Sequence, residues 1–418
     1  MNNKKYLAIV IAALAASSTA VVAGTNGTDL NNNLLPATGG MGGASVARTV
    51  EPAAAVFGNP ANLTQYNEGT SFTFGATYFD HNVEGNASAA FGGADIKSQT
   101  NPYLVPTIAI TQAFSENLVA GLGLSVTAGL GADFRGEGIG DPLSELIVFN
   151  ANVGAGYKVT ENLSLGAMAT IGNGYFQAST NENSGSTHNF GFRATVGGKY
   201  DMGATSFGAY YRSELKIRYD NYISDGAGNF WDDHVAQPAE IAFGVANNSL
   251  MGGALQVNAD VIHKDYSGAA FYKDFYRDQT VFNLGAQLTT GKAQWRVGYS
   301  HARDPIKRNL DPGNIGIGGN DPIQTPSAFV PLFGPQLPVT GPVVEYFQAT
   351  NAAAVWENTV TAGMGYQLMP NIKVDIHAAF SLDNEEDIGT ANSALGDNVW
   401  TIEASAWQAG LGLTWSFK

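Results

Sequence analysis

The chain has 418 residues and a formal net charge of -15 at pH 7, and only 14% of its residues are charged, whereas globular proteins have about 25%. The acidic balance argues against nucleic acid as a partner, and the absence of cysteine excludes a disulfide scaffold and thiol chemistry. Apolar residues make up 44% of the chain and glycine occurs 51 times. So little charge beside so much apolar material indicates a second apolar environment outside the protein, and lipid is the natural candidate.

The N-terminus has the layout of a secretory signal peptide. Lys4 and Lys5 precede an apolar run from Leu7 to Ala16, and small residues follow as far as Ala23. We therefore expect residues 1–23 to be a signal peptide that is cleaved after Ala23. The apolar run is too short for a membrane helix, which needs about 20 residues, and no later stretch comes closer. The sequence thus predicts an exported protein without a membrane helix.

From residue 69 onward, short segments alternate between apolar and polar residues, most clearly at 255–261 and 372–380. This pattern is typical of barrel strands with one face toward lipid and the other toward the lumen. We predict an all-β fold, a fourteen-stranded antiparallel transmembrane β-barrel over residues 69–418. The expected strands lie near residues 69–81, 102–115, 117–130, 145–160, 162–178, 186–201, 203–219, 235–249, 252–266, 277–290, 293–304, 353–369, 371–384 and 399–417.

The connections between these strands alternate between tight turns and long loops, as they do in barrels with short periplasmic turns and long external loops. The even strand count places both ends on the periplasmic side. In the last strand Trp415 and Phe417 face outward and would join an interfacial aromatic girdle. The terminal aromatic resembles the C-terminal signal of outer-membrane barrels, although Lys418 follows it.

Residues 24–68 show no sustained alternation and are expected to form a compact plug. Small-residue runs at 37–44 and 53–58 lead to the motif Asn59-Pro60-Ala61, just before the first strand. Together with the signal peptide and the fourteen strands, this layout resembles the FadL/TodX family, whose members carry long-chain fatty acids or hydrocarbons across the bacterial outer membrane. The resemblance covers the whole mature chain and implies that residues 24–68 are an N-terminal hatch inside the barrel.

The resemblance implies an ordered route: external loops capture an apolar molecule, a lumen pocket binds it, hatch movement opens a passage and the molecule leaves sideways through a kinked third strand. The third expected strand contains Gly121, Gly123 and Gly129, and glycine permits a bend. Ordinary barrel-wall glycines are an equal alternative. The implied partners are hydrophobic small molecules, outer-membrane lipid and the barrel assembly machinery, with a monomer in the outer membrane.

The seventh expected strand, residues 203–219, carries the main candidate ligand-binding cations. By the period of two, Arg212, Lys216 and Arg218 share one face. That face must point to the lumen, because Arg or Lys turned toward lipid costs about 2–4 kcal/mol near the midplane. Inward-facing cations are expected for the same reason at Arg193, Arg296 and Lys373.

Arg212 is the first candidate to bind the carboxylate of a fatty acid, because a guanidinium can hold a carboxylate with two hydrogen bonds. The alternative is that these cations only pair with acidic side chains and fill a polar interior. The acidic side chains available for such pairing are Glu214, Asp260 and Asp375.

The long loop from Pro305 to Asn351 is too apolar for a merely solvated surface. Phe329, Phe333 and Phe347 are candidate capture residues within it. A polar-solute porin and a surface barrel acting as adhesin or receptor remain alternatives, because exposed apolar patches also bind proteins. No catalytic motif or metal-ligand spacing occurs in the sequence, and Asp383 to Asp387 lacks the spacing of a calcium loop. We expect neither an enzyme nor a cofactor.

Overall fold

A computed structural model gives the fold and describes residues 33–179, 185–224, 230–274, 276–307, 341–351, 356–389 and 399–417. The expected signal peptide and the capture candidates Phe329 and Phe333 lie outside the described residues. Within the described residues, the helices are too short or too polar to span a membrane.

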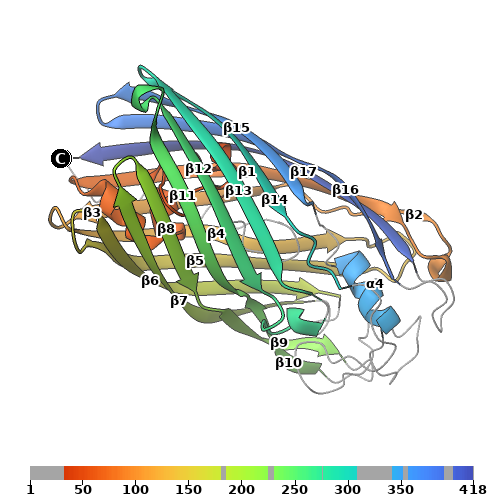
Figure 1. Ribbon diagram of the computed structural model, residues 1–418. Helices are drawn as coiled ribbons and strands as arrows, with labels where there is room; N and C mark the ends of the chain where they lie inside the picture. Colours follow the sequence, from red (N-terminus) through yellow and green to blue (C-terminus); the bar gives the residue numbers. More distant parts are fainter. Residues whose placement is uncertain are drawn as a thin grey trace, which may run out of the picture.

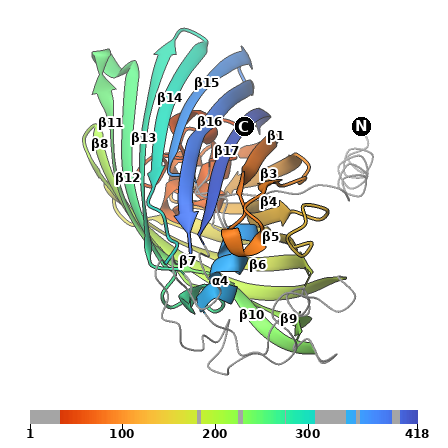
Figure 2. The same ribbon diagram turned by 90° about the vertical axis from the view of Figure 1, so that its right-hand side faces the viewer.

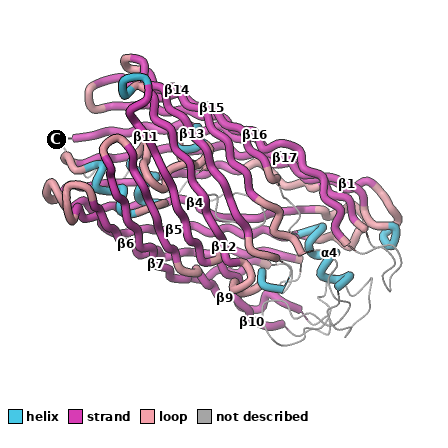
Figure 3. Tube along the Cα trace, viewed as in Figure 1, coloured by secondary structure: helices cyan, strands magenta, loops and turns pink. Residues whose placement is uncertain are grey.

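Within these ranges, fourteen strands form a closed antiparallel barrel (Figures 1 and 3). The last strand pairs with the first from Thr70–Phe417 to Asn86–Thr401, so the predicted fourteen-stranded barrel is confirmed. Closure leaves no free edge between these two strands, and lipid could not satisfy such an edge. The wall strands are β1 (Thr70–Asn86), β3 (Tyr103–Ala113), β4 (Leu118–Asp133), β5 (Leu143–Lys158), β6 (Leu163–Ala178), β7 (Ser186–Met202), β8 (Thr205–Arg212), β11 (Ala239–Leu250), β12 (Leu255–Asp265), β13 (Gln279–Thr290), β14 (Ala293–Ala302), β15 (Asn358–Met369), β16 (Ile372–Ile388) and β17 (Trp400–Phe417).

The connections alternate in length as expected. Residues 203–204 join β7 to β8 and residues 291–292 join β13 to β14, whereas residues 303–357 lie between β14 and β15. The start of β1 and the end of β17 meet at the short-turn end, on the left of Figure 1. We call the other end, where α4 (Gly341–Asn351) and β2 (Asp95–Lys97) lie, the long-loop end.

The outer surface of the wall is apolar. On β17, Leu411, Trp415 and Phe417 are exposed while Gln408 and Thr414 are buried, so the alternation predicted from sequence separates an outer face from a lumen face. Comparable exposed aromatic side chains occur around the barrel at Phe74, Tyr78, Phe114, Tyr157, Tyr200, Phe207, Phe243, Trp295 and Tyr366. Such a belt suits a lipid environment.

The expected seventh strand, residues 203–219, is wrong beyond Arg212. The wall strand β8 ends there, and residues 215–224 form β9 (Leu215–Ser224), which pairs with β10 (Phe230–Gln237) in a separate two-stranded sheet. The eighth wall strand is consequently β11, which begins at Ala239 rather than at residue 235. Figure 2 shows β9 and β10 at the long-loop end.

The β9–β10 hairpin packs against the lumen face of β6 and β7. A Cβ atom at Gly191 of β7 would lie 2.6 Å from the Lys216 carbonyl oxygen, and one at Gly172 of β6 would lie 2.5 Å from a Leu215 methyl group. Leu215, Ile217 and Tyr219 are buried on this side, whereas Lys216 on the opposite face is exposed. Arg212 and Lys216 therefore do not share one face of a wall strand, because the break after Arg212 reverses the alternation.

Inside the short-turn end lie three short helices of the N-terminal segment, which we define as residues 33–69. They are η2 (Thr38–Met41), α2 (Pro52–Phe57) and η3 (Pro60–Tyr66), drawn in red and orange in Figure 1. At the long-loop end, aromatic residues from α4, the hairpin and the upper wall strands form one buried cluster. The lumen thus contains two packed bodies, one near each end.

We predict that Gly191→Ala dislodges β9 from the wall, because its Cβ atom would collide with a backbone carbonyl that cannot rotate away. Such overpacking typically costs about 1–3 kcal/mol. Thermal unfolding should shift downward, and limited proteolysis should cut the segment between β8 and β11 sooner than in the wild type. Gly198→Ala in the same strand is the control, because its nearest neighbour would be a Leu165 methyl group 3.6 Å away. Equal protease sensitivity in both variants would contradict this packing role.

Candidate functional site in the lumen

The N-terminal segment is buried throughout most of its length. Met41, Ala54 and Ala61 have no exposed surface, and Val56 and Leu63 have almost none. Burial this complete requires the wall to surround the segment closely. The segment therefore fills the short-turn end of the lumen as part of the packed structure.

Lumen-facing glycines let the wall approach the segment at backbone distance. A Cβ atom at Gly208 would lie 2.3 Å from the Val46 carbonyl oxygen, and one at Gly298 would lie 2.2 Å from the Gly42 nitrogen. Real Cβ atoms do not come this close, so these positions accept only glycine without movement. Similar contacts below 3.0 Å with the segment occur at Gly75, Gly121, Gly123, Gly156, Gly166, Gly197, Gly244, Gly285 and Gly412.

Gly121 and Gly123 of β4 belong to this set. Their Cβ positions lie 2.8 Å from a Leu63 methyl group and 2.7 Å from a Val56 methyl group, so these glycines make room for the segment. The irregularity of β4 comes later, where the register against β5 shifts between Val126 and Ala128. The pairing of β4 with β3 also ends at Ser125. Gly129 lies beyond the shift and pairs with Ile147.

Asn59 of the Asn59-Pro60-Ala61 motif joins the segment to the wall. Its side-chain amide donates to the Gly198 carbonyl of β7 at 3.0 Å and to the Val46 carbonyl at 2.9 Å. Its side-chain oxygen accepts from the Ala61 N–H at 3.1 Å and caps η3. Pro60 is the first residue of η3, where its fixed φ and missing N–H cost nothing. Asn59 thus combines a helix cap with a bond to the wall.

Polar wall side chains hold the backbone of the segment at many further points. Asp260 of β12 accepts from the Ser45 and Val46 N–H groups at 2.6 and 3.0 Å. Asn258 donates to the Ala44 and Arg48 carbonyls at 3.1 and 2.7 Å. Other wall side chains that bond to backbone atoms of the segment are Thr77, Asn152, Thr361, Lys373, His377 and Gln408.

Within the segment itself, the Glu51 side chain also binds backbone N–H groups. Its carboxylate accepts from the Ala37 and Thr38 N–H groups at 2.9 and 2.6 Å. Burial raises the pKa of the Glu51 carboxyl, and the nearby Asp375 carboxylate raises it further, while the hydrogen bonds from Thr38 and the charge of Lys373 oppose the shift. The loop before η2 is thereby tied to the start of α2.

A row of charged side chains crosses the wall directly above the segment. Arg212 Nη1 lies 3.2 Å from Glu240 Oε2, and Lys264 Nζ lies 3.7 Å from Glu240 Oε1. The Arg212 guanidinium also donates to the Phe57 carbonyl at the end of α2 and lies 5.2 Å from the Tyr210 ring centroid. Arg212 therefore connects the wall, the N-terminal segment and a buried carboxylate.

The other candidate cations occupy different places. Arg193 is buried, two residues from Thr195, the residue that pairs with Arg212. Arg296 is buried elsewhere beside the segment and pairs with Asp375 at 2.8 Å. Lys216 is exposed on the hairpin. Of the candidate cations, the structure therefore places Arg212 in the charged row, and Arg193 lies one step further along the lumen face of β7.

Above the charged row lies the aromatic cluster of the long-loop end. Phe347 of α4 is buried there and meets Phe271 with ring centroids 5.6 Å apart. In the same helix Tyr346 stacks on Phe91 at 5.1 Å, and its hydroxyl donates to the Ile139 carbonyl. Phe347 therefore belongs to the buried aromatic cluster.

Glu240 and Lys264 were not singled out from the sequence. Their sequence signal was weak: Glu240 and Lys264 are charged residues at lumen-facing positions of β11 and β12. Such residues are common in barrel lumens. Among the described residues, no group of three or more His, Cys, Asp or Glu side chains could hold a metal ion. The site is therefore built from cations, one shared carboxylate, backbone carbonyls and aromatic rings.

Comparison with known proteins identifies the same architecture elsewhere. The chain matches the P. putida toluene transporter TodX at 19% identity over 91% of this chain and 98% of that chain, with a TM-score of 0.63. It matches a Pseudomonas aeruginosa FadL homologue at 14% identity over 96% and 100% of the two chains, with a TM-score of 0.68. The Ralstonia pickettii toluene transporter TbuX matches at 17% identity over 92% and 98%, with a TM-score of 0.62.

No protein-family model matches the chain, and no curated protein sequence matches it either. The chain nevertheless has the fold of the FadL and TodX proteins over almost its whole length. The resemblance stated from the sequence is confirmed at the level of the fold.

We predict that Gly197→Ala loosens the N-terminal segment, because its Cβ atom would collide with Asn59 Oδ1 at 2.0 Å. Losing the bonds made by Asn59 should cost about 1–3 kcal/mol. The variant should show more frequent opening to polar ions in planar bilayers than the wild type. Gly198→Ala, one residue away with its Cβ atom clear of the segment, should conduct as the wild type does. If the wild type and both glycine variants conduct equally, Asn59 does not anchor the segment to the wall.

Proposed function

We propose that the protein transports hydrophobic molecules across a bacterial outer membrane, with the N-terminal segment acting as a hatch. The observation that carries this proposal is a closed barrel with an apolar outer belt whose lumen holds a tightly bonded plug below a buried aromatic cluster. An aromatic lumen favours an apolar molecule, because burial is worth about 25 cal/mol per Å² of apolar surface. The structural neighbours described as toluene transporters and a FadL homologue support the same function.

The proposed route begins at the long-loop end. An apolar molecule enters among the loops, where we place Phe329 and Phe333 in the capture surface. It then displaces part of the aromatic cluster around Phe347. It reaches the charged row above the hatch. Because Arg212 holds the last carbonyl of α2, at Phe57, a ligand that attracts Arg212 weakens a bond of the hatch.

The proposed exit is lateral, through the wall beside β4. The pairing of β3 and β4 ends at Ser125, and β4 shifts its register against β5 after Val126. A local break in the hydrogen-bond ladder is the place where a barrel wall separates at least cost. The polar-solute porin is disfavoured because, in the part of the chain that the structure describes, residues 33–69 pack tightly against the wall at the short-turn end.

The test is uptake by cells whose own outer membrane lacks channels for hydrophobic molecules. We expect the wild-type protein to increase uptake of toluene or a long-chain fatty acid several-fold, while entry of a polar sugar of similar size stays unchanged. Faster sugar entry without faster toluene or fatty-acid uptake would instead support the porin. Asn59→Ala should alter uptake at equal surface abundance, since Asn59 links the hatch to Gly198.

A further prediction concerns the charge of the ligand. If the ligand is a fatty acid, Arg212→Ala should weaken binding of the acid about 10- to 100-fold, the equivalent of a lost charge-assisted hydrogen bond, while the matching alkane is affected much less. The ratio of acid to alkane affinity is the readout, because the variant also loosens the hatch for both ligands. Arg277→Gln is the control, since Arg277 pairs with Asp304 away from the charged row. Equal losses for both ligands would assign Arg212 a structural role and favour a neutral ligand.

A further inference from the structure

The hydrogen-bond ladder between β3 and β4 is interrupted before either strand ends. Their pairing stops at the pair of Thr107 and Ser125, whereas β3 stays paired with β1 as far as Tyr103 and β4 stays paired with β5 as far as Asp133. Nearer the long-loop end the contact resumes, because the Gln99 N–H donates to the Asp133 carbonyl at 2.7 Å. We call the part of the wall between these two contacts the unpaired stretch.

The local sequence favours this interruption. Pro106 is the next residue of β3 beyond the last pair, and it has no N–H with which to continue the ladder. On the other strand, the register of β4 against β5 shifts after Val126. On the outer face of β3 Leu104 is 51% exposed, whereas Val105 and Val126 belong to the buried cluster of the lumen. The unpaired stretch therefore lies between the lumen cluster and the outer face of the wall.

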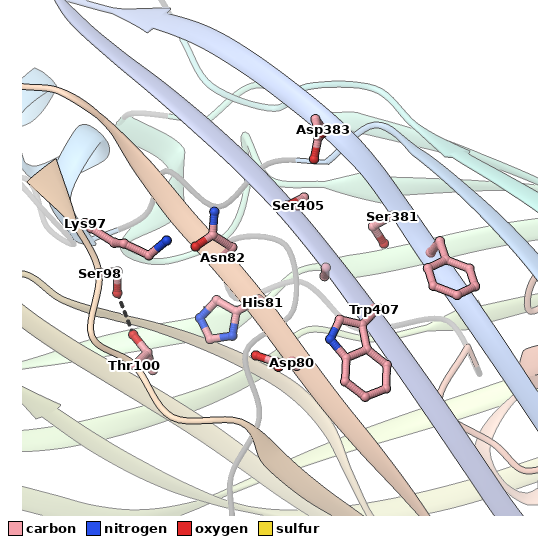
Figure 4. Close-up of a pocket in the computed structure, with 12 residues that line it drawn as sticks. Asp80, His81, Asn82, Lys97, Ser98, Thr100, Ser381, Asp383, Ser405 and Trp407 are labelled. Carbon is pink, nitrogen blue, oxygen red and sulfur yellow. Dashed lines mark hydrogen bonds between the residues drawn. The ribbon is translucent and has the colours of Figure 1, made fainter. Parts of the chain in front are cut away.

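Two buried rings fill the unpaired stretch from the lumen side. His81 of β1 and Tyr103 of β3 are 7% and 4% exposed and stack with their ring centroids 5.7 Å apart. His81 Nε2 lies 3.3 Å from the Gly131 carbonyl oxygen of β4, and a Cβ atom at Gly131 would lie 2.7 Å from the Tyr103 hydroxyl oxygen. Figure 4 shows His81 beside Ser98 and Thr100, which belong to the segment leading from β2 to β3. The two rings thus reach from β1 and β3 across to β4.

Each of these rings carries a polar atom that nothing in the described part of the chain satisfies. A carbonyl oxygen can only accept, so His81 Nε2 carries the proton in the neutral ring and Nδ1 is an acceptor. Nδ1 is buried without a donor, and the Tyr103 hydroxyl is buried without a hydrogen-bond partner. A buried polar group that lacks a partner costs free energy. An unmet acceptor and an unmet hydroxyl on two stacked rings therefore point to a ligand group that can donate and accept at once.

An uncharged hydroxyl group meets both needs, because it can donate to His81 Nδ1 and accept from the Tyr103 hydroxyl. A carboxylate has no proton to donate to Nδ1. The charges that act on the Tyr103 hydroxyl are also negative, those of Glu145 and Asp133, and only Asp133 is paired with a cation, Arg135, at 2.7 Å. These carboxylates disfavour an anion further. A plain hydrocarbon would leave both polar atoms without a partner.

We propose that His81 and Tyr103 form the gate of the lateral exit and bind the hydroxyl end of an apolar alcohol or phenol as it leaves the lumen. This inference rests on the transport function proposed above. The hydroxyl of the ligand donates to His81 Nδ1 and accepts from Tyr103, while its apolar part lies against the lumen cluster at Val105 and Val126. A hydrocarbon without a hydroxyl passes the same gate but gains no hydrogen bond there. The gate thus adds selectivity for hydroxylated molecules to an otherwise apolar path.

The test compares uptake of decanol with uptake of undecane, in which a methyl group replaces the hydroxyl, by the cells used for the transport assay. We expect His81→Phe and Tyr103→Phe, which keep both rings, each to lower the ratio of decanol to undecane uptake about fivefold, as expected for one lost hydrogen bond. Undecane uptake itself should stay at the wild-type rate. His263→Phe and Tyr157→Phe are the matched controls, because both side chains are exposed on other strands of the wall, and they should leave the ratio unchanged.

A second measurement locates the ligand on the wild-type protein. The full chain in detergent micelles is cross-linked to a decanol that carries a diazirine next to its hydroxyl, and the labelled peptides are identified by mass spectrometry. We expect label on the peptides that contain Tyr103 or Gly131. Label at other places alone, or equal effects of both phenylalanine variants on decanol and undecane, would overturn the proposal. If the wild type takes up neither compound, the transport function fails, whereas label at Tyr103 would still support the hydroxyl site.

Discussion

The constraint on which this structure depends is that every backbone polar group at the lipid surface must find its partner within the protein. Pairing of β17 with β1 meets that constraint by closing the sheet. Closure of so many strands has a second consequence, because about eight strands already give an interior that side chains can just fill. A wider barrel leaves lumen space that either water or additional chain occupies. The N-terminal segment, the β9–β10 hairpin and α4 are that additional chain.

The high glycine content follows from this filling. Where chain packs on the lumen side of the wall, glycine removes the side-chain layer that would otherwise separate the two backbones. Gly208 and Gly298 meet the N-terminal segment in this way, and Gly172 and Gly191 meet the hairpin. Glycine in a strand normally weakens it. Here the loss is offset by the hydrogen bonds and apolar contacts that close approach permits.

The sequence predicted what short-range patterns determine. The alternation in segments such as 372–380 located the wall strands, and the change of pattern before residue 69 marked the buried segment. The prediction of a wall strand at residues 203–219 failed after Arg212. Leu215, Ile217 and Tyr219 alternate with polar residues just as the residues of a wall strand do. Whether such a face meets lipid or a glycine surface in the lumen depends on contacts with β6 and β7, which are distant in sequence. Gly121 and Gly123 were open to two interpretations for the same reason, since Val56 and Leu63 determine their role.

The wall holds the N-terminal segment through two kinds of bond that differ in the cost of breaking them. Arg212 and Lys373 each bond to a backbone carbonyl of the segment and also lie beside a wall carboxylate, Glu240 or Asp375. Release of the segment would leave both charges partnered and would cost about 1.5–3 kcal/mol for each lost charge-assisted bond.

Asp260 is different, because its carboxylate is held by the Ser45 and Val46 N–H groups of the segment itself. Breaking them would leave a buried carboxylate uncompensated, which costs several kcal/mol. Two parts of the segment are therefore held unequally: the turn at residues 44–46 is fixed to β12 by a carboxylate, whereas α2 is held by neutral hydrogen bonds and by a cation that has another partner. If the segment acts as the hatch proposed above, it moves most readily by swinging α2 away from Arg212 while the turn at residues 44–46 stays bound.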